Sequence, residues 1–185
     1  AFEEEKRDGI GGVDGLNGVE GVVVSPGGRS VYASGVFDDA VAAFTRDPVT
    51  GALVFAEIER DAVNGVNGLD GTSSVAVSPD GKHVYATGYV DDGLAAFARD
   101  AATSALSFLE VETQAVGGVS GLDGPNEVVV SPDGKHVYVA SEVSDSIAVF
   151  ARNATTGLLS FVEAEANVAQ ARAAAHAFAI AGVWS

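Results

Sequence analysis

Carboxylates are the most abundant side chains in this sequence that could do chemistry. The 185 residues include 26 acidic side chains, 10 basic ones and 3 histidines, and they include no cysteine. The chain therefore offers no thiolate catalyst, no cysteine-bound zinc and no disulfide. Its formal net charge of −16 would repel nucleic acid and anionic membranes, so neither is an expected partner.

Glutamates recur along the chain in pairs that are two residues apart. The pairs are Glu3/Glu5, Glu57/Glu59, Glu110/Glu112 and Glu163/Glu165. Paired carboxylates can serve as general acid and base when their environments are buried and unequal. Here they alternate with apolar residues, which is typical of an outward sheet edge where charge prevents unwanted strand pairing. We therefore interpret these pairs as structural rather than catalytic.

The three histidines do not form a recognisable catalytic motif. His83 and His136 follow equivalent turns in two similar segments, whereas His176 stands alone. Because an active site is normally needed once, we interpret the two repeated histidines as surface turn residues. The sequence also has no Gly-x-Ser-x-Gly elbow and no His-Glu-x-x-His zinc motif. It identifies no catalytic residue.

Three glycine-rich segments that contain aspartate could offer oxygen ligands to a cation. They span residues 9–18, 63–71 and 116–124. Carboxylates and carbonyls suit calcium, but no segment has the clustered acids of an EF-hand loop. We interpret the segments as crossovers whose valines and leucines fill the gaps between structural units. We expect no metal or other cofactor, with calcium as the alternative.

Asn153 begins the only N-glycosylation sequon, Asn153-Ala154-Thr155. A glycan would fit there if the segment is a surface turn. Asp47 and Asp100 hold the same position in the other repeats, so Asn153 could instead be a turn former.

An internal repeat of 53 residues decides where these side chains must lie. In its second copy, short apolar segments at 74–78, 83–87, 94–98 and 105–112 alternate with turn residues. That pattern predicts four antiparallel strands, and a 53-residue step of this kind is typical of a β-propeller blade. The anchors that keep the step without insertion or deletion are Phe2/Phe55/Phe108/Phe161, Ser25/Ser78/Ser131, Tyr32/Tyr85/Tyr138, Phe44/Phe97/Phe150 and Arg46/Arg99/Arg152.

The segments Ser78–Tyr85 and Ser131–Tyr138 both read Ser-Pro-Asp-Gly-Lys-His-Val-Tyr. At these residues the chain resembles the YVTN-type β-propeller repeat of the lactonase-like family, which includes 6-phosphogluconolactonases. The resemblance covers roughly residues 1–166. It implies a seven-bladed ring with substrate near the top centre and sugar-lactone hydrolysis as the activity. No stretch matches a catalytic motif, so the resemblance places no catalytic residue.

We predict an all-β fold of three four-stranded antiparallel blades in a single domain, residues 1–185. The blades span about 20–61, 73–114 and 126–167. Residues 2–7 are predicted to form an orphan outer strand. In the tail, 168–185, one or two helical turns at 169–175 and a strand at 176–185 are expected, with a frayed or helical end as the alternative. A closed propeller needs at least about four blades. The chain is therefore an incomplete propeller, completed or extended by self-assembly or part of a longer one.

Successive connections in an antiparallel sheet lie at alternate ends of the blade, and the two ends are expected to differ in charge. One end is expected to carry six of the ten basic residues, and the other the aspartates of the loops and crossovers. The tyrosines and phenylalanines at 32, 85, 138, 44, 97 and 150 are expected to be mostly buried. The six basic residues are Arg29, Lys82, Lys135, Arg46, Arg99 and Arg152.

The leading functional hypothesis is a non-catalytic structural or interaction protein that assembles with itself. The terminal strands would form the joint, in a filament rather than a ring, through Phe2, Glu3, Glu5, Phe178, Ile180 and Trp184. The alternatives are a sugar-lactone hydrolase and a glycan- or peptide-binding module. Strong acidity and the absence of cysteine and methionine favour a secreted or cell-surface protein with a trimmed N-terminus. No apolar run is long enough to span a membrane.

Overall fold

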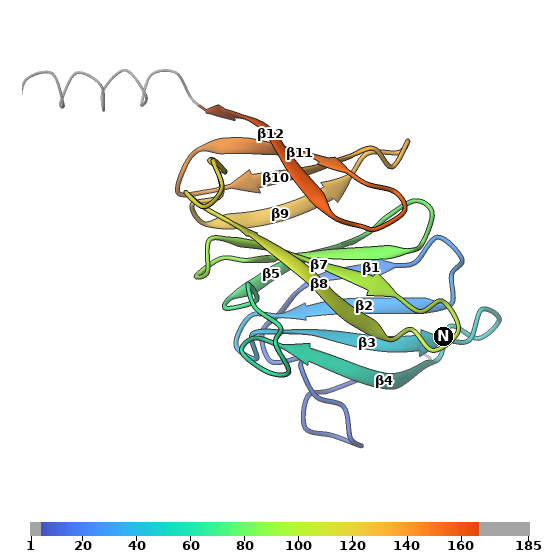
Figure 1. Cartoon of the computed structure of the whole chain (residues 1–185). Coiled ribbons are helices and arrows are strands. Elements are labelled where there is room, and N and C mark those ends of the chain that lie inside the picture. Colours follow the sequence, from blue (N-terminus) through green and yellow to red (C-terminus); the bar gives the residue numbers. More distant parts are fainter. Residues whose placement is uncertain (1–4, 167–185) are drawn as a thin grey trace, which may run out of the picture.

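The computed structural model describes residues 5–166, and these form three four-stranded antiparallel sheets without a helix. Each sheet follows chain order, and the sheet of β9–β12 lies at the upper end of the view in Figure 1. The predicted all-β class with three blades is therefore confirmed. The strands are β1 Val19–Val24, β2 Ser30–Gly35, β3 Ala40–Arg46, β4 Leu53–Arg60, β5 Thr72–Val77, β6 His83–Gly88, β7 Gly93–Arg99, β8 Leu106–Thr113, β9 Pro125–Val130, β10 His136–Ser141, β11 Ser146–Arg152 and β12 Leu159–Ala166.

The hairpin between β5 and β6 shows how the repeated motif makes its turn. The hydroxyl of Ser78 donates to the carboxylate of Asp80 at 2.6 Å and accepts from the backbone N–H of His83 at 3.0 Å. Gly81 has a φ of 71°, which glycine adopts without steric cost. The same bonds recur at Ser131, so the motif specifies a tight turn at one end of each of these blades.

Each blade contains the same pair of facing aromatic rings. The rings of Phe44 and Phe55 meet edge to face with centroids 5.6 Å apart, and the equivalent pairs in the other blades are 5.7 Å apart. In every blade the register shifts by one residue just before this pair. A β-bulge at that point increases the local twist of the outer strand.

The main cores lie between neighbouring sheets. Leu69 and Val66, from the crossover between the first two blades, are buried with residues of both sheets. Leu122 and Val119 do the same between the second and third blades. The crossovers therefore fill the gaps between blades, as the spacing of their apolar residues predicts.

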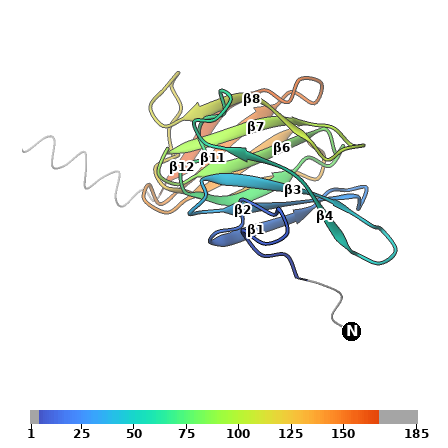
Figure 2. The same cartoon turned by 90° about the horizontal axis from the view of Figure 1, so that it is seen from below.

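Burial of the repeated aromatic residues is confirmed for five of the six positions. Tyr32, Tyr85 and the three phenylalanines are buried, whereas Tyr138 is half-buried. Tyr138 lies in the third blade, where no further sheet among the described residues covers it. Figure 2, turned by 90°, shows the order of β1 to β4 within the first sheet.

The predicted terminal strands are only partly within the described residues. Residues 5–7 are not in a strand, and the Arg7 carbonyl instead accepts the N–H of Ile10 in a turn. The strand prediction is thus wrong for these three residues, because the chain enters a hydrogen-bonded turn at Arg7 instead of continuing as an extended strand. In addition, a 53-residue step from Glu57 and Glu59 falls on Glu4 and Lys6, so the Glu3/Glu5 pair is out of register with the other pairs. Phe2 and Glu3, and the whole predicted tail with Phe178, Ile180 and Trp184, lie outside the described residues.

Replacing Phe97 by alanine should lower the free energy of unfolding by about 3–5 kcal/mol, because its ring is fully buried between two sheets. The measurement is urea denaturation followed by circular dichroism. Phe37→Ala is the control, since that ring is 74% exposed and its removal should change little. An unchanged midpoint for Phe97→Ala would contradict the assigned core.

Candidate functional site

The innermost strands β1, β5 and β9 lie side by side and line an open groove of about 660 Å³. This groove is the side of the blades that faces the centre of a propeller. A smaller hollow of about 300 Å³ lies at the end of the groove where these strands begin, and all three blades contribute to it. We call this hollow, together with the adjoining start of the groove, the mouth.

A β-bulge at the start of each inner strand points residues towards the mouth. In the first blade Glu20 and Gly21 lie opposite the single residue Ser34, and in the second Ser73 and Ser74 lie opposite Thr87. In the third blade Asn126 is the extra residue. Bulges are frequent next to functional sites because they redirect a side chain without ending the strand.

Six of the residues at the mouth occupy two repeat positions at which the residue type changes from blade to blade. Glu20, Ser73 and Asn126 occupy one repeat position and are three different residue types. Val36, Tyr89 and Glu142 occupy a second position and also differ. The anchor residues of the repeat are the same in every blade because the fold requires them. Positions that differ between blades are not constrained in this way, so they can serve a functional site that the protein needs only once. The sequence interpretation missed these residues, and their departure from the 53-residue pattern is the signal that could have found them.

Ser73 is buried and helps to hold the mouth together rather than acting as a nucleophile. Its hydroxyl lies 2.9 Å from that of Thr87 and 3.2 Å from the backbone carbonyls of Pro125 and Asn126. The carbonyl of Ser73 accepts the hydroxyl of Ser34 at 3.0 Å. Ser73 therefore links all three blades and fixes the backbone on which the exposed amide of Asn126 stands.

The exposed groups around the mouth are carboxylates with two neutral hydrogen-bond donors. Glu20, Glu127 and Glu142 are exposed, Asn126 supplies an amide, and the half-buried Tyr89 supplies a phenol. Within residues 5–166, no lysine or arginine lines the groove or the smaller hollow. A carboxylate can take a proton from water, and neutral donors can stabilise charge that develops on a carbonyl oxygen.

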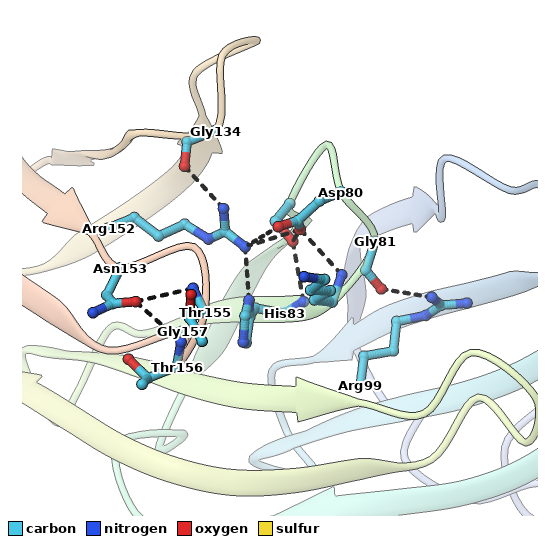
Figure 3. A network of polar contacts seen from close by, with 12 residues as sticks. Asp80, Gly81, His83, Arg99, Gly134, Arg152, Asn153, Thr155, Thr156 and Gly157 are labelled. Carbon is cyan, nitrogen blue, oxygen red and sulfur yellow. Dashed lines mark hydrogen bonds and ion pairs between the residues drawn. The ribbon is translucent and has the colours of Figure 1, made fainter.

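At the opposite end of the blades, an arginine reaches from each later blade into the one before it; it is buried in the third blade and half-buried in the second. Arg152 of β11 has a side chain that is 1% exposed, and it donates to the Tyr85 phenol at 3.0 Å. It also donates to the Gly134 carbonyl at 2.9 Å (Figure 3). The Tyr85 hydroxyl in turn donates to the Gly157 carbonyl at 2.8 Å. We call this arrangement the tyrosine–arginine clamp.

The same clamp joins the first two blades. Arg99 donates to the Tyr32 phenol at 2.8 Å and to the Gly81 carbonyl at 2.7 Å, and Tyr32 donates to the Ser104 carbonyl at 2.8 Å. The prediction that Arg152 belongs to a charged surface is therefore wrong, and Arg99 is half-buried rather than fully exposed. Strand parity places them at the correct end of the blade but does not show that the neighbouring blade covers them.

His83 is buried beside Arg152, so its interpretation as a surface turn residue is also wrong. Its Nδ1 lies 2.7 Å from the guanidinium. Burial lowers the pKa of His83, and the positive charge of Arg152 lowers it further, so the ring accepts this hydrogen bond in its neutral form. His136, the equivalent residue in the third blade, is only half-buried. His176 lies outside the described residues.

Asp80 completes the clamp between the second and third blades. Both carboxylate oxygens lie 2.9 Å from the Arg152 guanidinium. Burial alone would raise the pKa of Asp80, but hydrogen bonds from Ser78 and Arg152 outweigh it and lower the pKa to about 2. The buried positive charge is thus neutralised by an acid that stays ionised.

Two of the paired glutamates also join blades. Glu57 accepts the backbone N–H of Leu106 at 2.5 Å, and Glu110 accepts that of Leu159 at 2.5 Å. The interpretation of the pairs as edge protection therefore misses a contact with the next blade for these two residues.

Asn153 is exposed, and its Oδ1 accepts the N–H groups of Thr155 and Thr156, just as Asp100 does in its own turn. It is thus a turn former, and its glycosylation stays a prediction.

The aspartates at the mouth end mainly bind backbone N–H groups. Asp39 accepts the backbone N–H of Gly71 and Asp92 that of Gly124, each at 2.9 Å and each in the following crossover.

Asp8, Asp14 and Asp38 have carboxylate oxygens within 4.8 Å of one another, which is close enough for a cation. Arg60 already lies 3.1 Å from Asp14 and 3.6 Å from Asp38, so a guanidinium neutralises this cluster.

Replacing Arg152 by methionine should lower the free energy of unfolding by about 3–5 kcal/mol, because it leaves Asp80, Tyr85 and a buried carbonyl without their partner. Urea denaturation at pH 7 measures the change. Arg29→Met removes the same charge from an exposed position at the same end and should cost less than about 1 kcal/mol. Equal losses in the two variants would show that the clamp does not stabilise the fold.

Replacing Asp91 by asparagine should stabilise the protein at neutral pH. Burial raises the pKa of Asp91, and the neighbouring Asp61 carboxylate adds to the effect. The stabilisation from the protonated acid is complete below its ordinary pKa of 3.8 and is lost as the pH rises through the higher folded-state value. Asparagine avoids that loss and can still accept the N–H of Asp70.

The measurement for Asp91→Asn is the unfolding free energy from pH 3 to pH 7. Asp100→Asn is a control of opposite sign, because two backbone N–H groups lower the pKa of Asp100 and make its ionised form the stabilising one. A gain for Asp91→Asn that does not grow with pH would contradict the assigned burial of this carboxyl.

Comparison with known proteins places the fold and the repeat in one family. The family profile described as Lactonase, 7-bladed beta-propeller matches residues 57–175. A Bacteroides fragilis structure assigned as a 6-phosphogluconolactonase is 25% identical, with a TM-score of 0.67 over 80% of this chain and 38% of that one. The periplasmic gluconolactonase of Pseudomonas aeruginosa is 28% identical, with a TM-score of 0.64 over 77% of this chain and 38% of that one.

The chain thus spans about two fifths of the length of these solved relatives. Comparison with curated proteins gives no match. The profile match covers more than half of the chain and includes the whole of the second and third sheets. The chain therefore belongs to the lactonase family of seven-bladed β-propellers.

Proposed function

We propose that this chain forms part of a sugar-lactone hydrolase whose substrate binds at the mouth. The observation that carries the proposal is the set of exposed polar residues that break the repeat and stand on or beside the bulges of the inner strands. They gather at a single end of the groove, towards the centre of the propeller. Membership of the lactonase family supports this hydrolase over the non-catalytic reading.

The chemistry required is the addition of water to the acyl carbon of the lactone. A base takes a proton from the water, the ring C–O bond breaks, and the alcohol oxygen leaves with a proton to give the open hydroxy acid. Glu20 is our candidate for the base because it borders both the groove and the hollow. Asn126 borders both as well, and its amide can donate to the carbonyl oxygen as negative charge develops there.

The charge of the mouth favours a neutral substrate over a phosphorylated one. Three carboxylates surround the hollow and the adjoining groove, and the part of the chain seen in the structure adds no cation there. A phosphate group brought to this position would be repelled, since like charges in a partly enclosed site interact strongly. An uncharged aldonolactone would instead offer hydroxyl groups to the carboxylates.

The decisive experiment measures hydrolysis of glucono-δ-lactone by the purified chain, following acid release at constant pH. The rate should exceed the spontaneous rate, and Glu20→Gln should lower kcat by about 10²-fold or more, as expected when a general base is lost. The 6-phosphorylated lactone should show a lower kcat/KM than the neutral one.

Asp100→Asn is the matched control for this assay. It removes one carboxylate from an exposed turn at the opposite end of the blades, where asparagine already occurs in the third repeat as Asn153. It should leave turnover unchanged. Hydrolysis no faster than the spontaneous reaction, or an equal loss in both variants, would overturn the proposal.

A further inference from the structure

We propose that acid loosens the interface between the second and third blades, because His83 can take up a proton only at the ring nitrogen that binds Arg152. The interface between the first and second blades has the same tyrosine–arginine clamp but lacks this sensitivity, since a serine stands at the position of the histidine. Both interfaces lie wholly within residues 5–166. The inference does not depend on the hydrolase activity.

The geometry of the clamp determines which ring nitrogen of His83 carries the hydrogen. Nδ1 lies 2.7 Å from Nη2 of Arg152, and a guanidinium can only donate a hydrogen bond (Figure 3). Nδ1 is therefore the nitrogen without a hydrogen, and Nε2 carries it. A further proton can be added only at Nδ1. That proton ends the hydrogen bond and places two positive charges side by side in a buried position, where they repel strongly.

The charged groups that act on the His83 ring come from two elements. Arg152 of β11 and Lys82 of the turn before β6 disfavour the protonated ring, whereas Asp80 of the same turn favours it. The turn of residues 153–157 also packs against the ring but contains no charged side chain. Burial and Arg152 outweigh Asp80, so the pKa of His83 is lower than its ordinary value of 6.5.

The direction of the pH effect follows from this lowered pKa. In an opened interface His83 takes up its proton near pH 6.5, whereas in the closed interface it does so only at a lower pH. Its contribution to the closed interface is therefore complete above pH 6.5 and is lost as the pH falls towards the lower folded-state pKa. The pKa of Asp80 is about 2 and that of Tyr85 about 12, so neither group changes its charge in this range.

The first interface provides a matched comparison within the same molecule. Ser30 lies one repeat before His83, and its hydroxyl accepts a hydrogen bond from Nη2 of Arg99 at 2.6 Å. The same hydroxyl lies 2.8 Å from that of Ser104. Because a serine hydroxyl takes up no proton near pH 6, this arginine keeps its acceptor in mild acid.

The mouth end of the second interface does not share the sensitivity of the clamp end. There the Ser73 hydroxyl bonds to that of Thr87 and to the backbone carbonyls of Pro125 and Asn126. Hydroxyls and carbonyls do not titrate in the range where histidine does. We therefore expect acid to open the interface at the clamp end while the two blades stay joined at the mouth.

Two backbone amides report on the two interfaces in one experiment. The N–H of Leu159 donates to Glu110 across the second interface, and that of Leu106 donates to Glu57 across the first, each at 2.5 Å. Hydrogen exchange of the full 185-residue chain is followed by NMR between pH 7 and pH 5 and corrected for the intrinsic rate. We expect Leu159 to lose protection as the pH falls, whereas Leu106 keeps it.

His83→Asn removes the titrating group but keeps an acceptor, because the asparagine Oδ1 can take the place of Nδ1. In this variant the protection of Leu159 should depend on pH no more than that of Leu106. His136→Asn is the matched control, since this ring holds the equivalent position in the third blade, half-buried beside Tyr138. It should leave the loss of protection at Leu159 unchanged.

Titration of the His83 ring in the unaltered chain gives a second readout that needs no variant to fold. Its nitrogen NMR spectrum should show the neutral Nε2–H form at pH 7 and a midpoint below pH 6.5. A midpoint at or above that value would overturn the proposal. So would equal losses of protection at Leu159 and Leu106, or a loss at Leu159 that persists in His83→Asn.

Discussion

The guanidinium enclosed at each blade interface, buried for Arg152 and half-buried for Arg99, is the constraint on which the rest of the structure depends. An arginine that leaves water must find an opposite charge and acceptors for its donors, or the fold loses several kcal/mol. Arg152 meets that requirement only when the second-blade turn, the third-blade turn and the Tyr85 phenol are all in place. Burial raises the pKa of Tyr85 to about 12, so its hydroxyl keeps the proton that it donates to Gly157. The relative position of two sheets is thus fixed by directional bonds as well as by apolar packing.

The fold could be predicted from the sequence because its determinants recur in every blade. Turn residues such as Pro79 and Gly81 and the alternation of apolar residues specify the strands, and the 53-residue step specifies their grouping. Contacts between blades could not be derived in the same way. Arg152 and His83 have the residue types and spacing of surface turns, and only the position of the neighbouring sheet shows that they are buried. The same holds for Glu57, whose bond to Leu106 spans 49 residues.

The candidate site escaped prediction for the opposite reason. Catalytic motifs are fixed patterns of neighbouring residues, whereas Glu20, Asn126 and Tyr89 come from different blades and stand at positions where the copies differ. The acidic residues at the mouth end also have two different roles, which composition alone does not distinguish. Asp39 and Asp92 organise the crossovers by accepting backbone N–H groups, whereas Glu20 and Glu142 face the open hollow. Hydrogen-bond partners distinguish the two groups, and these are known only from the fold.

The bulges of the inner strands have a consequence for how such a protein can evolve. Ser34 in the first blade and Thr87 in the second each accept a backbone N–H of the bulge, and the buried Ser73 links the three blades. The exposed side chains of Glu20 and Asn126 lie outside these contacts, so they can change without disturbing the other blades. Duplication of one 53-residue unit would add a whole blade whose interface already matches its neighbours. The exposed positions at the mouth can then change one at a time, while the repeated residues that hold the blades together stay the same. New ligand preferences can arise by single substitutions there, at little cost to folding.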